Sequence, residues 1–218
     1  MRINFTVKRS AFYVFGCFLT AFGVNLLLRS DLGAGPWDTV TYSLSALSGL
    51  TLGTSSALIN ALLILFIIVA NKKMRYFLLV VPAFFISVFI DVWDLLILGD
   101  FYPNILWLKL LFYISGFYVI TLGLAIIVAT DFVAMIFEEL THTLMRLFKI
   151  KQFAYVRIFL ETFAVLTAMI LGAIASIGFG AINIGTVIMA IFIGPIIAIN
   201  LKFIIKIKHA FVKSNEER

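Results

Sequence analysis

The chain has 218 residues, of which 63% are hydrophobic and 13% are charged, and its formal net charge is +6. A soluble domain carries about 25% charged residues, so a compact soluble fold of this composition would expose large apolar patches. These values exclude an ordinary soluble enzyme, a disordered chain and a nucleic-acid-binding protein, and they predict an integral membrane protein.

Six apolar segments are long enough to cross a bilayer, whose hydrocarbon core takes about 20 residues of helix. The first segment follows a basic N-terminal stretch but has no small-residue cleavage site, so we expect a retained helix rather than a signal peptide. Two further segments, 36–48 and 132–148, are short or amphipathic and predict re-entrant or interfacial helices. The expected spans cover approximately residues 10–28, 52–70, 76–98, 105–129, 154–176 and 179–205.

The distribution of basic residues indicates how many times the chain crosses the membrane. With six crossings and a cytoplasmic N-terminus, all of the 17 Lys and Arg residues except Arg29 and Lys109 fall on the cytoplasmic side. An additional crossing at 36–48 would place the basic turn at residues 71–75 outside, against the positive-inside rule. We therefore expect six crossings with both termini in the cytoplasm.

The chain repeats itself at an offset of 100 residues, because residues 12–47 align with residues 112–147. Each half predicts a long helix, a break, a short helix and two further long helices. Three crossings in each half place the halves in opposite orientations, as in many secondary transporters. The expected fold is an all-α polytopic membrane bundle of six transmembrane helices, built as a 3+3 inverted repeat. Its first repeat covers residues 1–104, and its second covers 105–218 with a short basic cytoplasmic tail.

Glycines recur at a spacing of two helical turns in the first helix of each half. They are Gly16 and Gly23 in one half and Gly116 and Gly123 in the other. Small residues on one helix face allow two membrane helices to approach closely. We therefore expect these glycines to act in helix packing.

The first break has the composition of an interrupted membrane helix. Glycine permits positive φ, proline suits the first turn of a helix, and the N-terminus of the new helix presents free N–H groups to an anionic ligand or to Asp38. The alternative is a tight interfacial turn in which Trp37 lies among lipid headgroups. The candidate binding residues of this break are Asp31, Gly33, Gly35, Pro36, Trp37 and Asp38.

Ionisable residues within apolar spans give a second signal. A carboxylate at the bilayer centre costs about 2.5–3.5 kcal/mol, so it is expected to face a partner or a cavity. Glu161 lies four residues after Arg157 on one helix face, and the two form either a pair that permits insertion or, with Asn60, the lining of a cavity. Asp91 and its approximate counterpart Asn200 complete the candidates in the spans.

The second break adds Asp131, Glu138 and Glu139 to the candidate residues, and the alternative for its short helix is a polar face at the cytoplasmic surface. Glu139 and His142 have the spacing used in di-iron bundles, but such a site needs a second motif and two further glutamates. One cysteine and two histidines are too few for a Cys- or His-based centre. We expect no metal, no cofactor and, without a nucleophile set or a P-loop, no enzymatic activity.

Two motifs resemble the YczE/YyaS/YitT family of bacterial integral membrane proteins, and the YczE branch most of all. The first is Asp31-Leu32-Gly33-Ala34-Gly35-Pro36-Trp37-Asp38, followed by Leu52-Gly53-Thr54; the second is Ile184-Gly185-Thr186 with Ile193-Gly194-Pro195-Ile196. Asn200 departs from the family, whose members tend to carry an acidic residue there. The resemblance covers nearly the whole chain and implies a location in the bacterial plasma membrane.

These features predict a transporter or permease of a small molecule or ion, with its site between the two repeats. One alternative is a non-transporting membrane factor that binds or positions a partner protein, and a weaker one is a lipid flippase. The expected partners are the lipid bilayer and an unidentified small-molecule or ion ligand, with a protein partner under the first alternative and no nucleic acid.

Overall fold

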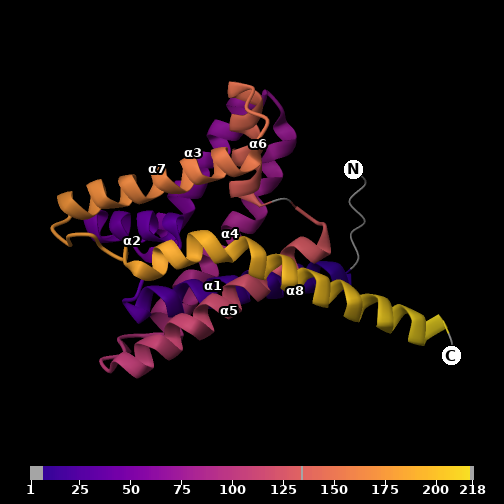
Figure 1. Cartoon of the computed structure of the whole chain (residues 1–218), viewed down its shortest axis with the longest axis horizontal. Coiled ribbons are helices and arrows are strands. Elements are labelled where there is room, and N and C mark those ends of the chain that lie inside the picture. The colour runs from indigo at the N-terminus through magenta and orange to yellow at the C-terminus, as the bar shows by residue number, and fades with distance from the viewer. Residues whose placement is uncertain (1–6, 134, 217–218) are drawn as a thin grey trace.

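The computed structural model describes residues 7–133 and 135–216, while the side chains of residues 8 and 207–216 lie outside the description. Within these ranges the protein is helical and has no strand (Figure 1). A 3-10 segment, η1 (Met74–Leu79), precedes α4, and a π-helical segment, η2 (Val92–Leu98), follows it. The α-helices are α1 (Val7–Ser30), α2 (Pro36–Ser48), α3 (Leu52–Asn71), α4 (Val80–Asp91), α5 (Leu106–Thr130), α6 (Ile136–Phe148), α7 (Phe153–Ile174) and α8 (Ile184–Glu216).

Six helical stretches are long and apolar enough to cross a membrane, which confirms the expected number of spans. The two short helices, α2 and α6, have 13 residues each and are not among them. The last span begins at Ile184 instead of 179, because Gly178 and Gly180 take positive φ values of 65° and 58° in the preceding turns. The spans are Arg9–Ser30, Leu52–Asn71, Met74–Leu98, Leu106–Thr130, Phe153–Ile174 and Ile184–Lys206.

The ends of the helices follow the 100-residue offset of the sequence. After α1 and α5, the chain turns at Asp31 and Asp131, with φ values of 57° and 50°. After α2 and α6, it turns at Gly49 and Lys149, with φ values of 71° and 54°. Aspartate and glycine tolerate this left-handed conformation better than most residues, so the local sequence favours the turns at Asp31, Gly49 and Asp131. Lysine at position 149 has no such preference.

Four glycines allow α1 and α5 to pack closely. A Cβ atom on Gly23 would lie 2.8 Å from the Gly116 carbonyl oxygen, and a Cβ atom on Gly123 would lie 2.8 Å from the Gly16 carbonyl oxygen. The early glycine of each helix therefore meets the late glycine of the other, so the two helices run antiparallel. Side chains at these positions would force the backbones apart, and the predicted role in packing is confirmed.

Each short helix packs against a long helix of the other half. In Figure 1, α2 lies beside α7, and α6 lies beside α3. Trp37 of α2 stacks on Phe137 of α6, with ring centroids 5.1 Å apart and an interplanar angle of 24°. Trp37 and Phe137 occupy corresponding positions in the two halves, so the stacked rings bring the first turns of both short helices together.

Candidate functional site

A cavity of about 180 Å³ lies between the two halves and is lined by residues of α1 to α8. This volume is below the range of about 300–1,000 Å³ typical of drug-sized ligands, so it suits a small solute. A larger groove of about 740 Å³ along α1 has no charged side chain among the described residues of its lining. The polar and charged side chains that line the central cavity are Thr20, Asp38, Thr41, Ser56, Asn60, Glu138, Arg157 and Glu161.

Asp38 reaches the cavity from the first turn of α2. Gly35 is the N-cap of this helix and Pro36 is its first residue, where a missing N–H is tolerated. A Cβ atom at position 35 would lie 2.6 Å from Asp38 Oδ2, so a side chain there would displace the carboxylate from its present position. Asp38 lines the cavity, and α2 is not one of the six spans.

Burial changes the proton affinity of the Asp38 carboxyl. Desolvation raises its pKa to about 7, and a hydrogen bond with the Gly35 backbone opposes this shift. Removal from water disfavours the charged form of a carboxyl. Asp38 therefore exchanges protons near neutral pH, where an exposed aspartate would be fully ionised.

An ion pair on α7 forms another part of the cavity wall. Arg157 Nε donates a hydrogen bond to Glu161 Oε1 at 2.6 Å, and the two side chains are 30% and 12% exposed. Because the opposite charges neutralise each other, the pair can enter an apolar span. Both residues also line the cavity, so the pairing and the cavity lining proposed for them occur together.

Asn60 presents an unused acceptor to the same cavity from α3. Its Nδ2 atom donates to Ser56 Oγ at 3.3 Å, and the side chain is only 8% exposed. Its Oδ1 atom accepts no hydrogen bond from any residue in the described ranges. An acceptor that lines a cavity and has no protein partner can accept a hydrogen bond from water or from a ligand.

Glu138 of α6 lines the cavity at the position that corresponds to Asp38 of α2. Among the described residues, no basic side chain forms an ion pair with either carboxylate. The charged groups that line the cavity are therefore the carboxylates of Asp38, Glu138 and Glu161 and the guanidinium of Arg157. Arg157 is already paired with Glu161.

The aspartates of the two breaks lie outside the cavity lining and form ion pairs at helix ends. Lys109 Nζ lies 2.7 Å from Asp31 Oδ2. Arg9 Nη2 lies 3.8 Å from Asp131 Oδ2, and the same guanidinium donates to the carbonyl groups of Thr130 and Asp131. Arg9 and Lys109 correspond at the 100-residue offset, so the two halves use equivalent residues for both pairs.

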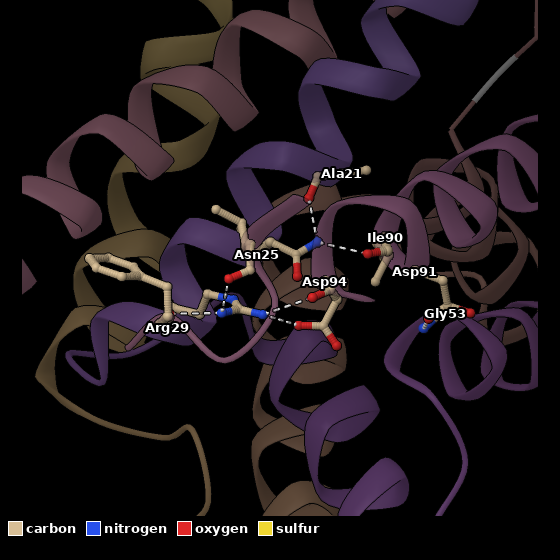
Figure 2. Close-up of polar contacts among 9 residues, drawn as sticks. Ala21, Asn25, Arg29, Gly53, Ile90, Asp91 and Asp94 are labelled. Atoms are coloured by element: carbon tan, nitrogen blue, oxygen red, sulfur yellow. Dashed lines mark hydrogen bonds and ion pairs between the residues drawn. The ribbon is translucent and has the colours of Figure 1, made fainter. Parts of the chain in front are cut away.

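Gly33 and Asp91 also lie outside the cavity lining. Gly33 has a φ of 122°, and a Cβ atom on it would lie 2.5 Å from the Thr186 nitrogen at the start of α8. Asp91 accepts a hydrogen bond from the Gly53 N–H at 2.7 Å (Figure 2). It accepts a second from the Thr51 hydroxyl, also at 2.7 Å. A carboxylate at this place satisfies free N–H groups at the N-terminus of α3.

The remaining candidates, Asn200 and Glu139, have partners elsewhere. Asn200 Nδ2 donates to Thr121 Oγ1 at 3.2 Å and so links α8 to α5. Glu139 Oε2 lies 3.9 Å from Arg146 Nη2 on α6. The candidates that the structure brings to the cavity are therefore Gly35, Pro36, Trp37, Asp38, Asn60, Glu138, Arg157 and Glu161.

Arg29 forms a polar cluster that the sequence analysis did not single out (Figure 2). Its side chain is 3% exposed and donates to Asp94 Oδ1 at 2.7 Å, to the Asp94 carbonyl at 3.0 Å and to the Phe101 carbonyl at 2.7 Å. The Tyr102 ring centroid lies 4.8 Å from its guanidinium carbon. The sequence held one indication of this role: Arg29 is one of only two basic residues on the expected outer side of the membrane. Arg29 ties the end of α1 to η2 and the following loop.

Comparison with known proteins gives a family and two relatives. Residues 7–202 match the family described as "Family of unknown function (DUF6198)". The chain is 31% identical to "Uncharacterized protein YyaS" of Bacillus subtilis (strain 168) over 130 residues, which are 60% of the chain and 65% of that protein.

The second relative is "Uncharacterized membrane protein YczE" of the same organism. The identity is 35% over 92 residues, which are 42% of the chain and 43% of that protein. The chain therefore matches less than two thirds of the length of either relative, and no solved structure matches it. The resemblance to YczE and YyaS predicted from the two motifs is confirmed.

Proposed function

Since the chain belongs to the DUF6198 family and is a membrane protein with six apolar spans, we propose that it transports a small solute through the central cavity. The observation that carries this proposal is that corresponding residues of both halves line the cavity. We further propose a location in the bacterial plasma membrane with both termini in the cytoplasm, as the distribution of basic residues favours.

The cavity lining supports an inverted arrangement of the two halves. Antiparallel packing of α1 on α5 and the paired contacts Lys109–Asp31 and Arg9–Asp131 agree with it. If the halves exchange conformations, the same cavity opens first to one side of the bilayer and then to the other. The lining pairs that lie 100 residues apart are Thr20/Ile120, Val24/Leu124, Gly35/Met135, Pro36/Ile136, Trp37/Phe137 and Asp38/Glu138.

Flux measurements with the purified full chain in liposomes test the proposal. A panel of inorganic ions, amines, carboxylates and neutral solutes would be screened by radiolabel uptake and by electrical recording on supported membranes. We expect saturable, protein-dependent flux of at least one small solute. Glu161→Gln leaves Arg157 without its partner in the cavity wall and should lower this flux by about tenfold or more.

A matched control is Asp100→Asn, because Asp100 is an exposed carboxylate that does not line the cavity. Its flux should equal that of the wild type. The proposal would be overturned if no solute showed flux. A stable co-purifying protein that still binds the Glu161→Gln variant would then favour a factor that positions a partner protein. Transfer of labelled phospholipid between leaflets without solute flux would favour a flippase.

A further inference from the structure

We propose that the cavity binds a small organic ammonium ion, and that this cation and a proton compete for the Asp38 carboxylate. The inference rests on the proposed function, because it takes the cavity as the solute site. It adds a substrate class and a coupling between binding and protonation.

The charges of the cavity favour a cation. Among the described residues, Arg157 is the one basic side chain in the lining, and Glu161 already neutralises it at 2.6 Å. Asp38 and Glu138 remain without an ion pair within the described residues. Asp38, half-buried in the cavity wall, and Glu138, exposed at the cavity's edge, give this site a negative potential, and a positively charged solute relieves it.

The neutral groups of the cavity suit an organic cation that donates hydrogen bonds. Asn60 lines the cavity and its Oδ1 accepts no hydrogen bond from the described residues, so an ammonium N–H can donate to it. The stacked Trp37 and Phe137 rings offer aromatic faces, which attract cations. Apolar side chains such as Ile59 and Leu124 can contact an alkyl group. A divalent metal ion would instead require about six to eight oxygen ligands.

Proton competition follows from the surroundings of Asp38. The titratable and charged groups that face it across the cavity are Glu138 from α6 and Arg157 and Glu161 from α7; the lining residues of α1, α3, α4, α5 and α8 include none. When the ammonium ion binds, the O–H bond of protonated Asp38 breaks, and the proton leaves to solvent. Desolvation raises the pKa of this carboxyl to about 7, so the exchange takes place near neutral pH.

Calorimetric titration of the detergent-purified full chain tests the ligand class. The probe is butylammonium, and its matched analogues are the neutral alcohol butanol and the anion butyrate. We expect saturable binding of butylammonium alone, with affinity at least about tenfold lower in Asp38→Asn and unchanged in Asp100→Asn. Glu138→Gln, at the second unpaired carboxylate, should also weaken binding.

The comparison of the three ligands uses the wild type and stays informative if Asp38→Asn fails to fold. Equal binding of butanol or butyrate would overturn the inference, as would the absence of butylammonium binding. Saturable binding of sodium ions in place of butylammonium would overturn it in favour of a metal-ion site.

The pH dependence tests the competition. Ammonium binds the ionised carboxylate, which is present above its pKa and is lost as pH falls. Affinity should therefore fall about tenfold between about pH 8 and about pH 6. Titrations in buffers of different ionisation enthalpy should show proton release near pH 7. Affinity that stays constant over this range would overturn the competition between cation and proton.

The binding measurements separate this inference from the proposed function. Butylammonium binding without any solute flux would refute transport and leave the cation site standing. Flux restricted to anions or neutral solutes would support transport and refute the cation site.

Discussion

Arg29 and Arg157 both enter the apolar interior, but their surroundings differ. Arg29 is 3% exposed, and Asp94 and nearby carbonyl groups accept its hydrogen bonds. Arg157 has one carboxylate partner, Glu161, and borders the cavity. A buried guanidinium with many acceptors holds one geometry, so Arg29 fixes the local structure, whereas Arg157 is placed to respond to the contents of the cavity.

This difference predicts a large loss of stability for Arg29→Leu. The substitution leaves the Asp94 carboxylate, 17% exposed, without its partner, which costs about 3–5 kcal/mol for a buried pair. Lys109→Leu is the control, because its partner Asp31 is 73% exposed and such pairs contribute about 1 kcal/mol or less. Equilibrium unfolding in lipid–detergent micelles measures both values, and equal losses would contradict this assignment.

At the scale of the helices, glycine has different roles in α1 and α8. A Cβ atom on Gly23 would lie 2.6 Å from the Ile120 nitrogen, whereas one on Gly194 meets no atom within 4 Å. The first glycine permits a helix contact, and the second lies on an open face of α8. The role of each glycine therefore depends on whether a neighbouring helix packs against it.

Alanine substitution at these two glycines should separate the roles. Gly23→Ala forces α1 and α5 apart, and overpacking of this kind costs about 1–3 kcal/mol. Gly194→Ala should be neutral or slightly stabilising, since alanine is a better helix former. Thermal unfolding of the purified variants measures the effect. A melting temperature for Gly23→Ala at or above that of Gly194→Ala would contradict the close packing of α1 on α5.

At the scale of the whole molecule, several helix contacts occur twice, once for each half, between corresponding helices. α2 packs on α7, α6 packs on α3, α4 packs on α1, and α8 packs on α5. The first two of these contacts join the halves, whereas the last two lie within one half. If the two halves have opposite orientations in the membrane, the C-terminal ends of α2 and α6 lie on opposite sides of the bilayer.

Cysteine labelling tests this orientation. Leu50 and Ile150 follow the two short helices and are each 39% exposed, whereas the native Cys17 is buried. We expect a membrane-impermeant maleimide to label Leu50→Cys in intact cells and to label Ile150→Cys only after permeabilisation. Wild-type protein, with Cys17 alone, gives the background. Labelling of both positions from one side would refute the inverted arrangement.

Membrane spans follow from the sequence because each depends on the local run of apolar residues. The same holds for the first short helix, which has its expected bounds, and for the turns at Asp31 and Asp131. The second short helix begins at Ile136 instead of at 132, because the turn that starts at Asp131 continues into the following residues. The sequence also indicated Asp38, Asn60 and Glu161, which line the cavity. Carboxylates and amides in apolar segments are rare, so composition alone makes them conspicuous.

The partners of these polar residues depend on tertiary structure. Asp31, Asp38 and Asp91 all appeared as candidates, but the first pairs with Lys109, the third satisfies the start of α3, and only Asp38 lines the cavity. The contact between Arg29 and Asp94 joins residues 65 positions apart. Apolar length is a property of a segment, whereas an ion pair or a shared cavity depends on which helices pack together, and that is decided when the two halves assemble.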